Sequence, residues 1–356
     1  MVDLIIPSVG QTPKLERRCP FCERNNGNIH SATRRRRISD TRIDFIVQRR
    51  MKCPWCKTSW TLRPEGIGDG RHRTDRLIIL GVVLYMFGLS HRRVEQFLPL
   101  LGCKGSKSGV ERDVADAGQN AKQLHRCAPK IHVNVLGVDG TGAKMAGKRR
   151  AGMLFFVDVE RSKLICVEPV NETDSRKVRE HVLKVMAEVG AQKLCTDELS
   201  VYEGIVDESN HKICLAHWRK SKLKRAYEIH RQLKIEGLEY AAKDMLELSA
   251  LLRLDPMPQK IPESIEKLVR RYINCRSGVL WKVNQLLQHI ERTWHKVSKD
   301  GPDRTNNATE RLIGLNYKIR AKTMRGFKSW PKAVNHCYLS EYLRGDNEIC
   351  NLRKVI

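Results

Sequence analysis

The stretch Val133-Asn-Val-Leu-Gly-Val-Asp139 decides the fold, because the hydrophobic period of the chain changes there. Upstream, apolar residues recur at helical spacing, whereas from this point they alternate as in a β-strand. Two similar runs follow at 151–159 and 163–170, with glycine or charged residues between them. The sequence therefore predicts three consecutive strands of one sheet.

A helix and two further strands complete this region. Asp174 or Ser175 can cap a helix with one apolar stripe, and Gly190 can end it. Strands are expected at 193–197 and 212–215, with a short helix between them. The order β-β-β-α-β-α-β predicts a mixed sheet covered by helices, which binds ligands at the carboxyl ends of its strands.

Three carboxylates form the candidate active site. Asp139 ends the first expected strand and Asp197 ends the fourth, and these strands lie side by side in such a topology. Glu310 follows in Asn306-Asn-Ala-Thr-Glu-Arg-Leu-Ile313, near the start of a helix. Hard oxygen ligands of this kind hold Mg²⁺ or Mn²⁺, and two such ions support in-line displacement at phosphorus.

Each carboxylate also has a structural interpretation. Asp139 can belong to a simple turn with the glycine that follows it. Asp197 can cap the end of a strand, which would leave its neighbour Glu198 as the ligand. Asn307-x-x-Glu310 resembles a capping box, in which the glutamate binds backbone N–H groups at the helix start.

Two cysteine pairs near the N-terminus predict a zinc site. Cys19-Pro-Phe-Cys22 and Cys53-Pro-Trp-Cys56 are separated by 30 residues and supply four thiolates for one tetrahedral ion. A closed shell of this kind makes the zinc structural, and the alternative is four unrelated buried thiols. Arg34, Arg35, Arg36 and Arg37 are expected on the intervening loop, where they either contact DNA phosphates or are merely solvated.

The next segment favours a helix-turn-helix. Residues 89–102 fit a first helix that enters a glycine-containing turn, and Ser106 or Ser108 can cap a second helix over 109–117. The second helix of such a motif enters the major groove of DNA, so Ser108 and Arg112 are its candidate DNA contacts. A plain helical hairpin is the alternative.

The composition favours a polyanionic partner. Lys and Arg number 66 against 40 Asp and Glu, a net charge of +26. An anionic membrane is the competing partner, but no apolar run approaches the roughly 20 residues that span a bilayer. The N-terminus lacks the basic region of a signal peptide. We therefore expect a cytoplasmic, nucleoid-associated protein without a membrane partner.

With these motifs in view, the chain resembles the DDE transposases of bacterial and archaeal insertion sequences. The resemblance lies in Val138-Asp139-Gly-Thr, Thr196-Asp197, Asn306-Asn-Ala-Thr-Glu310 and the basic run after it. It implies a ribonuclease H-like core in which Asp139, Asp197 and Glu310 coordinate two Mg²⁺ or Mn²⁺ ions.

The resemblance also concerns a Cys-x₂-His motif and the basic run. Cys214 and His217 are similar to a motif of the Mutator-like superfamily, which implies a structural or DNA-side role for them. The basic run is expected to line the DNA beside the final glutamate, and its candidate contacts are Lys318, Arg320, Lys322 and Arg325.

The expected architecture is a multidomain α/β protein with five parts. These are a zinc ribbon (1–72), a helix-turn-helix domain (73–130), the first part of the core (131–234), a helical insertion (235–300) and the last part of the core (301–356).

The expected activity is phosphodiester hydrolysis followed by strand transfer from a 3′-OH. The partners would be double-stranded DNA of element ends and target, and the resemblance implies a homodimer or larger synaptic assembly. The alternatives are a non-catalytic DNA-binding regulator or domesticated transposase, and a ribonuclease H-like nuclease.

Overall fold

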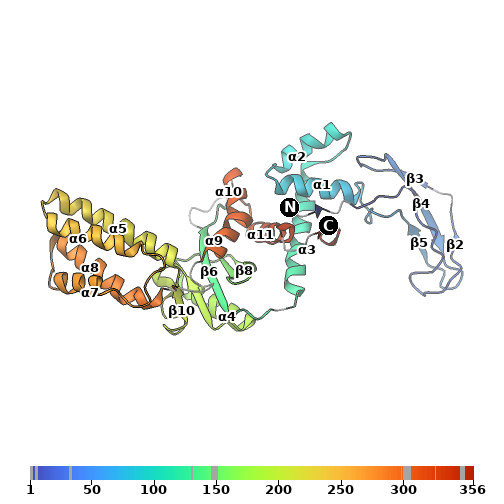
Figure 1. Ribbon diagram of the computed structural model, residues 1–356. Helices are drawn as coiled ribbons and strands as arrows, with labels where there is room; N and C mark the ends of the chain where they lie inside the picture. The colour runs from blue at the N-terminus through green and yellow to red at the C-terminus, as the bar shows by residue number, and fades with distance from the viewer. Residues whose placement is uncertain are drawn as a thin grey trace. The chain divides into compact units, whose positions relative to one another are not determined.

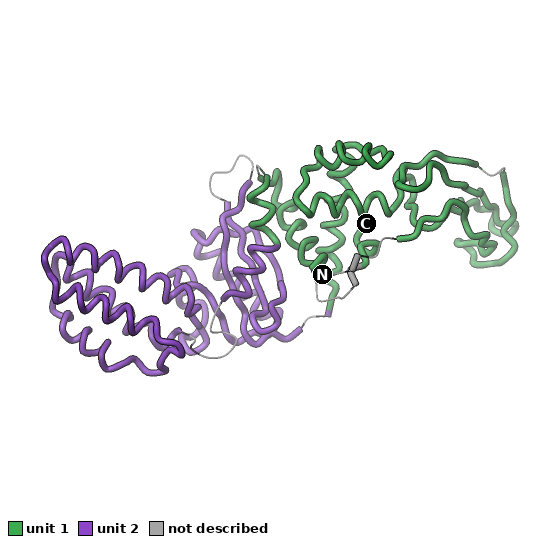
Figure 2. Tube along the Cα trace, turned by 45° about the horizontal axis from the view of Figure 1, so that its top comes forward, with its two compact units in different colours: residues 1–128, 316–356 green, residues 129–315 purple. Residues whose placement is uncertain are grey.

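The computed structural model describes residues 3–4, 7–31, 34–129, 131–145, 151–297, 299, 306–324, 326–344 and 349–356. The chain forms two compact units, which Figure 2 distinguishes by colour. Unit 1 comprises Met1–Ala128 and Asn316–Ile356, and unit 2 comprises Pro129–Leu315. The change of period near residue 130 therefore coincides with the first division between the units. Most of the segment 301–356, which the sequence predicts to be the last part of the core, belongs to unit 1.

A small antiparallel sheet carries the cysteine pairs in unit 1. Its long strand β4 (Phe45–Lys52) pairs with β2 (Asn28–Ile29), β3 (Arg34–Arg37) and β5 (Ser59–Leu62). The four consecutive arginines therefore form a strand and not the expected loop. All four residues of β3 pair with β4, and this pairing overrides the weak strand preference of such a charged run.

Helices make up the rest of unit 1. Thr74 caps α1 (Asp75–Met86), and Ser106 caps α3 (Lys107–Cys127) by accepting the Gly109 N–H at 3.1 Å. The expected helix, glycine turn and capped helix are therefore present, although α3 extends ten residues beyond the predicted end. The remaining elements are α2 (His91–Phe97), η1 (Leu98–Leu101), α10 (Ile319–Thr323), α11 (Trp330–Arg344), η6 (Leu352–Lys354) and the pair β1 (Asp3–Leu4) and β11 (Ile349–Cys350).

The five-stranded sheet of unit 2 has the order β10-β9-β6-β7-β8. The central strand β6 pairs in parallel with β9 and antiparallel with β7, as Figure 1 lets the reader follow. The prediction that the first and fourth strands are neighbours is confirmed. The bounds are β6 (Val135–Gly142), β7 (Gly152–Asp158), β8 (Lys163–Glu168), β9 (Lys193–Thr196) and β10 (His211–Ile213).

Helix α4 (Ser175–Val189) covers one face of this sheet. Asp174 caps it by accepting the Lys177 N–H at 3.2 Å, and Gly190 ends it with a φ of 71°. Its buried stripe of Val178, Val182, Val185 and Met186 packs into the core with Leu136, Leu154 and Phe156 of the strands. The predicted cap, stripe and end of this helix are all confirmed. The short η2 (Ser200–Tyr202) follows β9.

A bundle of four helices follows the sheet, and Figure 1 shows these helices side by side. They are α5 (Leu215–Ile235), α6 (Glu239–Leu252), α7 (Glu263–Tyr272) and α8 (Gly278–Thr293), followed by η3 (Trp294–Lys296). Val279, Val283, Leu287 and Ile290 of α8 lie in the bundle core, where Trp218 and Trp294 pack edge to face. The bundle begins earlier than residue 235, because α5 contributes Ala226, Ile229 and Leu233 to that core.

The chain after Asn306 forms several consecutive helical elements. Helix α9 (Asn307–Ile313) continues into a π-helical turn, η5 (Gly314–Lys318), and then into α10. Across the described parts of the chain, none of the helices combines the length and the apolar character that crossing a bilayer requires.

Candidate active site and zinc site

The four paired cysteines come together as predicted. Their ligand atoms all lie within 4.8 Å of one another, and the Sγ atoms of Cys19 and Cys56 and of Cys22 and Cys53 are each 3.6 Å apart. A tetrahedral zinc ion with Zn–S bonds of about 2.3 Å places its sulfur ligands roughly 3.8 Å apart. The cluster therefore has the donor set and the spacing of a Cys₄ zinc site.

The backbone turns tightly after each cysteine pair, so that both thiols of the pair face the same point. After the first pair, Glu23 adopts a φ of 58° and its N–H donates to the Cys19 carbonyl at 2.9 Å. After the second, Lys57 adopts a φ of 61° and the Cys53 N–H donates to Thr58 O at 2.9 Å. Hydrogen bonds with Thr58 lower the pKa of Cys56 to about 6. A backbone hydrogen bond at Arg24 lowers the pKa of Cys22, but burial and the three neighbouring thiols outweigh it and raise that pKa to about 11.

Three carboxylates cluster at the edge of the large sheet. Asp139, Glu172 and Asp197 each offer an oxygen within 4.8 Å of the others. Gly137 of β6 pairs with Cys195 of β9. If this register is continued by two residues along each chain, Asp139 lies opposite Asp197. The predicted convergence of the two aspartates is confirmed. Asp139 lies inside β6 and not at its end, because the hairpin with β7 extends the strand to Gly142.

Glu172 is the member of this cluster that the sequence does not predict. It lies between β8 and α4, and its Oε1 accepts a hydrogen bond of 2.6 Å from the Tyr202 hydroxyl. A Cβ on Gly140 would lie 2.2 Å from Glu172 Oε2, so the glycine after Asp139 makes room for this carboxylate. Since β8 runs in the same direction as β6 and β9, its carboxyl end reaches the same edge of the sheet.

The electrostatics of the cluster favour a cation. Burial and the negative charge of Glu172 raise the pKa of Asp197 to about 6. Burial and the same carboxylate also raise the pKa of the Tyr202 hydroxyl, which therefore remains a hydrogen-bond donor. Carboxylates this close ionise together only when a positive charge offsets their repulsion. The group has the oxygen donors that Mg²⁺ or Mn²⁺ requires.

Glu310 lies outside this carboxylate cluster. Its Oε1 is 2.7 Å from His217 Nε2, and 45% of its side chain is exposed. The neighbouring Cys214 side chain and the Glu310 carboxylate outweigh burial and raise the pKa of His217 to about 9. The capping-box interpretation is wrong, because Glu310 contacts His217 and the helix start has no side-chain cap.

The start of α9 is nevertheless fixed beside the cluster. Asn306 donates its side-chain amide to Val138 O and its backbone N–H to Cys214 Sγ, both at 3.1 Å. A Cβ on Gly137 would lie 2.5 Å from Thr309 Oγ1, so the glycine lets α9 approach β6 closely. Cys214 is buried, and its sulfur accepts a hydrogen bond at the junction of α5 and α9.

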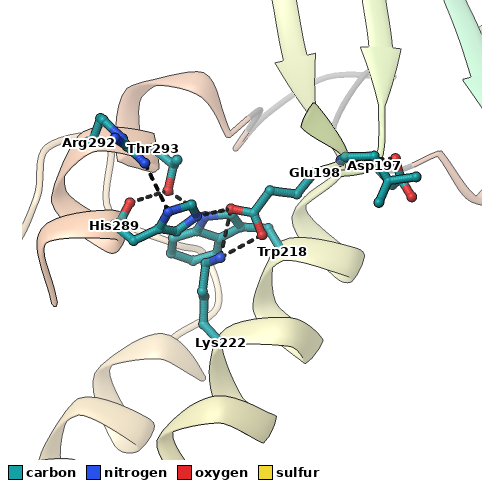
Figure 3. Close-up of polar contacts among 8 residues, drawn as sticks. Asp197, Glu198, Trp218, Lys222, His289, Arg292 and Thr293 are labelled. Carbon is teal, nitrogen blue, oxygen red and sulfur yellow. Dashed lines mark hydrogen bonds and ion pairs between the residues drawn. The ribbon is translucent and has the colours of Figure 1, made fainter. Parts of the chain in front are cut away.

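Glu198 turns away from the carboxylate cluster. Its Oε1 accepts hydrogen bonds from Lys222 Nζ at 2.7 Å and from His289 Nε2 at 2.6 Å, as Figure 3 shows. Lys222 is only 5% exposed, so this is a buried ion pair that joins the end of β9 to α5 and α8. Asp197 also accepts the Leu199 N–H at 3.3 Å, so it closes a turn in addition to joining the cluster.

The candidate DNA contacts of the zinc sheet and of α3 have different surroundings. Ser108 and Arg112 are exposed one turn apart on α3. Arg36 donates to the Arg71 carbonyl at 2.6 Å, whereas Arg34, Arg35 and Arg37 are exposed.

The basic run after Glu310 is only partly available. Lys318 and Lys322 are exposed one turn apart. Arg320 is 6% exposed, donates to the carbonyls of Gly88 and Leu89, and lies 4.2 Å from the centre of the Tyr85 ring. Arg320 is therefore a packing residue in this structure and not the predicted DNA contact. Arg325 lies outside the described residues.

A comparison with protein-family models finds no match, and neither does a comparison with curated proteins.

Proposed function

We propose that the chain is a DNA transposase that cleaves and joins phosphodiesters with divalent metal ions. The observation that carries the proposal is the cluster of Asp139, Glu172 and Asp197 at the carboxyl edge of the sheet. The strand order, with an antiparallel second strand, supports a ribonuclease H-like core.

The roles of the acidic residues follow from their surroundings. Asp139 and Asp197 on adjacent strands, with Glu172, would hold the ions, which supply a charged clamp for the attacking and leaving oxygens. Tyr202 keeps Glu172 in place by donating to it. Glu310, held on His217 beside β6, would complete the site on the side of α9.

DNA binding is the second half of the proposal. The net charge of +26 and the exposed Arg34, Arg35, Arg37, Ser108 and Arg112 support contacts of the zinc sheet and of α3 with duplex DNA. A pair or larger assembly of chains would be needed to bring two element ends together.

The test uses the full chain with a duplex that spans its own coding sequence and flanks, together with a target plasmid. The wild type should release 3′-OH ends in Mg²⁺ or Mn²⁺ and join them to the plasmid. Asp139→Asn should bind the duplex equally well without cleaving it.

Three outcomes overturn the proposal. Ends that are released but never joined indicate a nuclease. Binding without cleavage by the wild type indicates a DNA-binding regulator. Equal cleavage by Asp139→Asn places the chemistry elsewhere.

A further inference from the structure

Helix α5 has one face in the bundle core and one face in solvent. Trp218, Lys222, Ala226, Ile229 and Leu233 are buried on the first. The opposite face exposes Lys220, Lys224, Tyr227 and Arg231, which recur at three- and four-residue spacing and therefore form one stripe. We call these four residues the α5 stripe.

The α5 stripe begins at the candidate active site. His217, which contacts Glu310, lies one turn before Lys220 and on the same face of the helix. The helix leaves the edge of the sheet and runs along the bundle, as Figure 1 shows. From His217 to Arg231 the face is about 21 Å long, which matches roughly six nucleotides along one strand of B-form DNA.

The basic residues of α5 differ in their exposure and in their contacts. Lys222 is buried against Glu198, and Arg219 donates to the Leu254 carbonyl at 2.7 Å. The α5 stripe keeps its cations in solvent, where the side chain of Lys224 is 78% exposed. Glu228 lies nearby, but its contacts with Lys224 and Arg225 are 3.9–4.0 Å long and exposed, so they are weak.

We propose that the α5 stripe binds the backbone of substrate DNA on its way to the carboxylate cluster. Lys220, Lys224 and Arg231 would neutralise successive phosphates, and Tyr227, 62% exposed, would donate a hydrogen bond to the backbone. The inference rests on the proposed function for one point, namely that the phosphate to be cleaved lies at the carboxylate cluster.

The test compares two full-length variants with equal loss of charge. One is Lys220→Gln/Lys224→Gln/Arg231→Gln. Its control is Lys243→Gln/Lys260→Gln/Arg276→Gln, which changes exposed residues of the same bundle that do not belong to α5. Fluorescence anisotropy measures binding of a 30-base-pair duplex between 50 and 300 mM KCl, and Mn²⁺ titration measures the metal site.

In the plot of the logarithm of the DNA association constant against the logarithm of the salt concentration, the slope of the stripe variant should be smaller in magnitude by about 2.7. The reason is that each of the three lost phosphate contacts contributes about 0.9 to the slope. Its Mn²⁺ affinity and the slope of the control variant should match the wild type. An unchanged slope, or an equal loss in the control, overturns the inference. The variant Asp139→Asn separates the two proposals. Equal cleavage by the wild type and Asp139→Asn would exclude the proposed chemistry. The inference would still stand if the stripe variant lowered the salt dependence of DNA binding.

Discussion

Replacing Lys222 by methionine tests the buried ion pair that ties the end of β9 to the bundle. Methionine has nearly the length of lysine, so Lys222→Met mainly removes the charge. Loss of one partner of a buried pair costs about 3–5 kcal/mol, because the other charge stays buried alone. His289 still donates to Glu198 at 2.6 Å, so we expect the lower end, about 3 kcal/mol.

The control is a double-mutant cycle with Glu198→Gln. Glu198→Gln leaves the Lys222 ammonium buried without a counter-charge, and Lys222→Met leaves Glu198 with His289 alone, whereas Glu198→Gln/Lys222→Met leaves neither charge. The double variant should therefore lose less than the sum of the single variants, with a coupling energy of at least about 1 kcal/mol.

Hydrogen exchange of α5 and α8 amides, followed as urea is raised, reports the unfolding free energy of this region separately from unit 1. Because Glu198 directly follows Asp197, both single variants should also bind Mn²⁺ more weakly. Strictly additive costs, or a loss below about 1 kcal/mol for Lys222→Met, would show that this ion pair does not stabilise the bundle.

Three further predictions concern the metal sites. Gly140→Ala places a Cβ against the Glu172 carboxylate and should weaken Mn²⁺ binding about 10- to 100-fold in calorimetry, whereas Gly142→Ala, with nothing within 4 Å of its Cβ, should not; equal affinities would contradict this. The pKa of Asp197 is raised from 3.8 to about 6 in the folded chain, so without metal the stability that its protonation contributes is complete below about pH 4 and lost as the pH rises through 6. At about 1.36 kcal/mol per pKa unit this difference corresponds to about 3 kcal/mol, which solvent screening at this partly exposed carboxyl reduces to about 1–2 kcal/mol in denaturation experiments. Mg²⁺ should reverse that loss, Asp197→Asn should abolish it, and a metal-free chain that gains stability over this interval would exclude the explanation. Cys22→Ser should reduce the zinc content measured by mass spectrometry from one ion per chain to none and expose the amides of β4 to exchange; retained zinc would show that the four thiols are not the ligands.

Features that depend on local periodicity could be predicted from the sequence. The cap, stripe and end of α4 were expected because Asp174 and Gly190 bracket a helix with valine on one face. The neighbouring positions of β6 and β9 followed from the order of strands and helices, and they bring Asp139 and Asp197 together.

Features that depend on contacts between residues far apart in the sequence could not be predicted. Glu172 follows a strand with no motif around it, and only the direction of β8 brings it to the cluster. Arg320 resembles its exposed neighbours in sequence, but Tyr85 and the carbonyls of Gly88 and Leu89, more than 200 residues away, bury it. Glu310 was expected among the carboxylates, yet His217 holds it.

The most direct test of the carboxylate site is a crystal structure of the full chain with Mn²⁺ at pH 7.5, recorded with anomalous scattering. We expect a manganese peak coordinated by oxygens of Asp139 and Asp197, with Glu172 in direct or water-mediated contact. Saturating Mn²⁺ with no peak at these carboxylates, or a peak only at other residues, would contradict it.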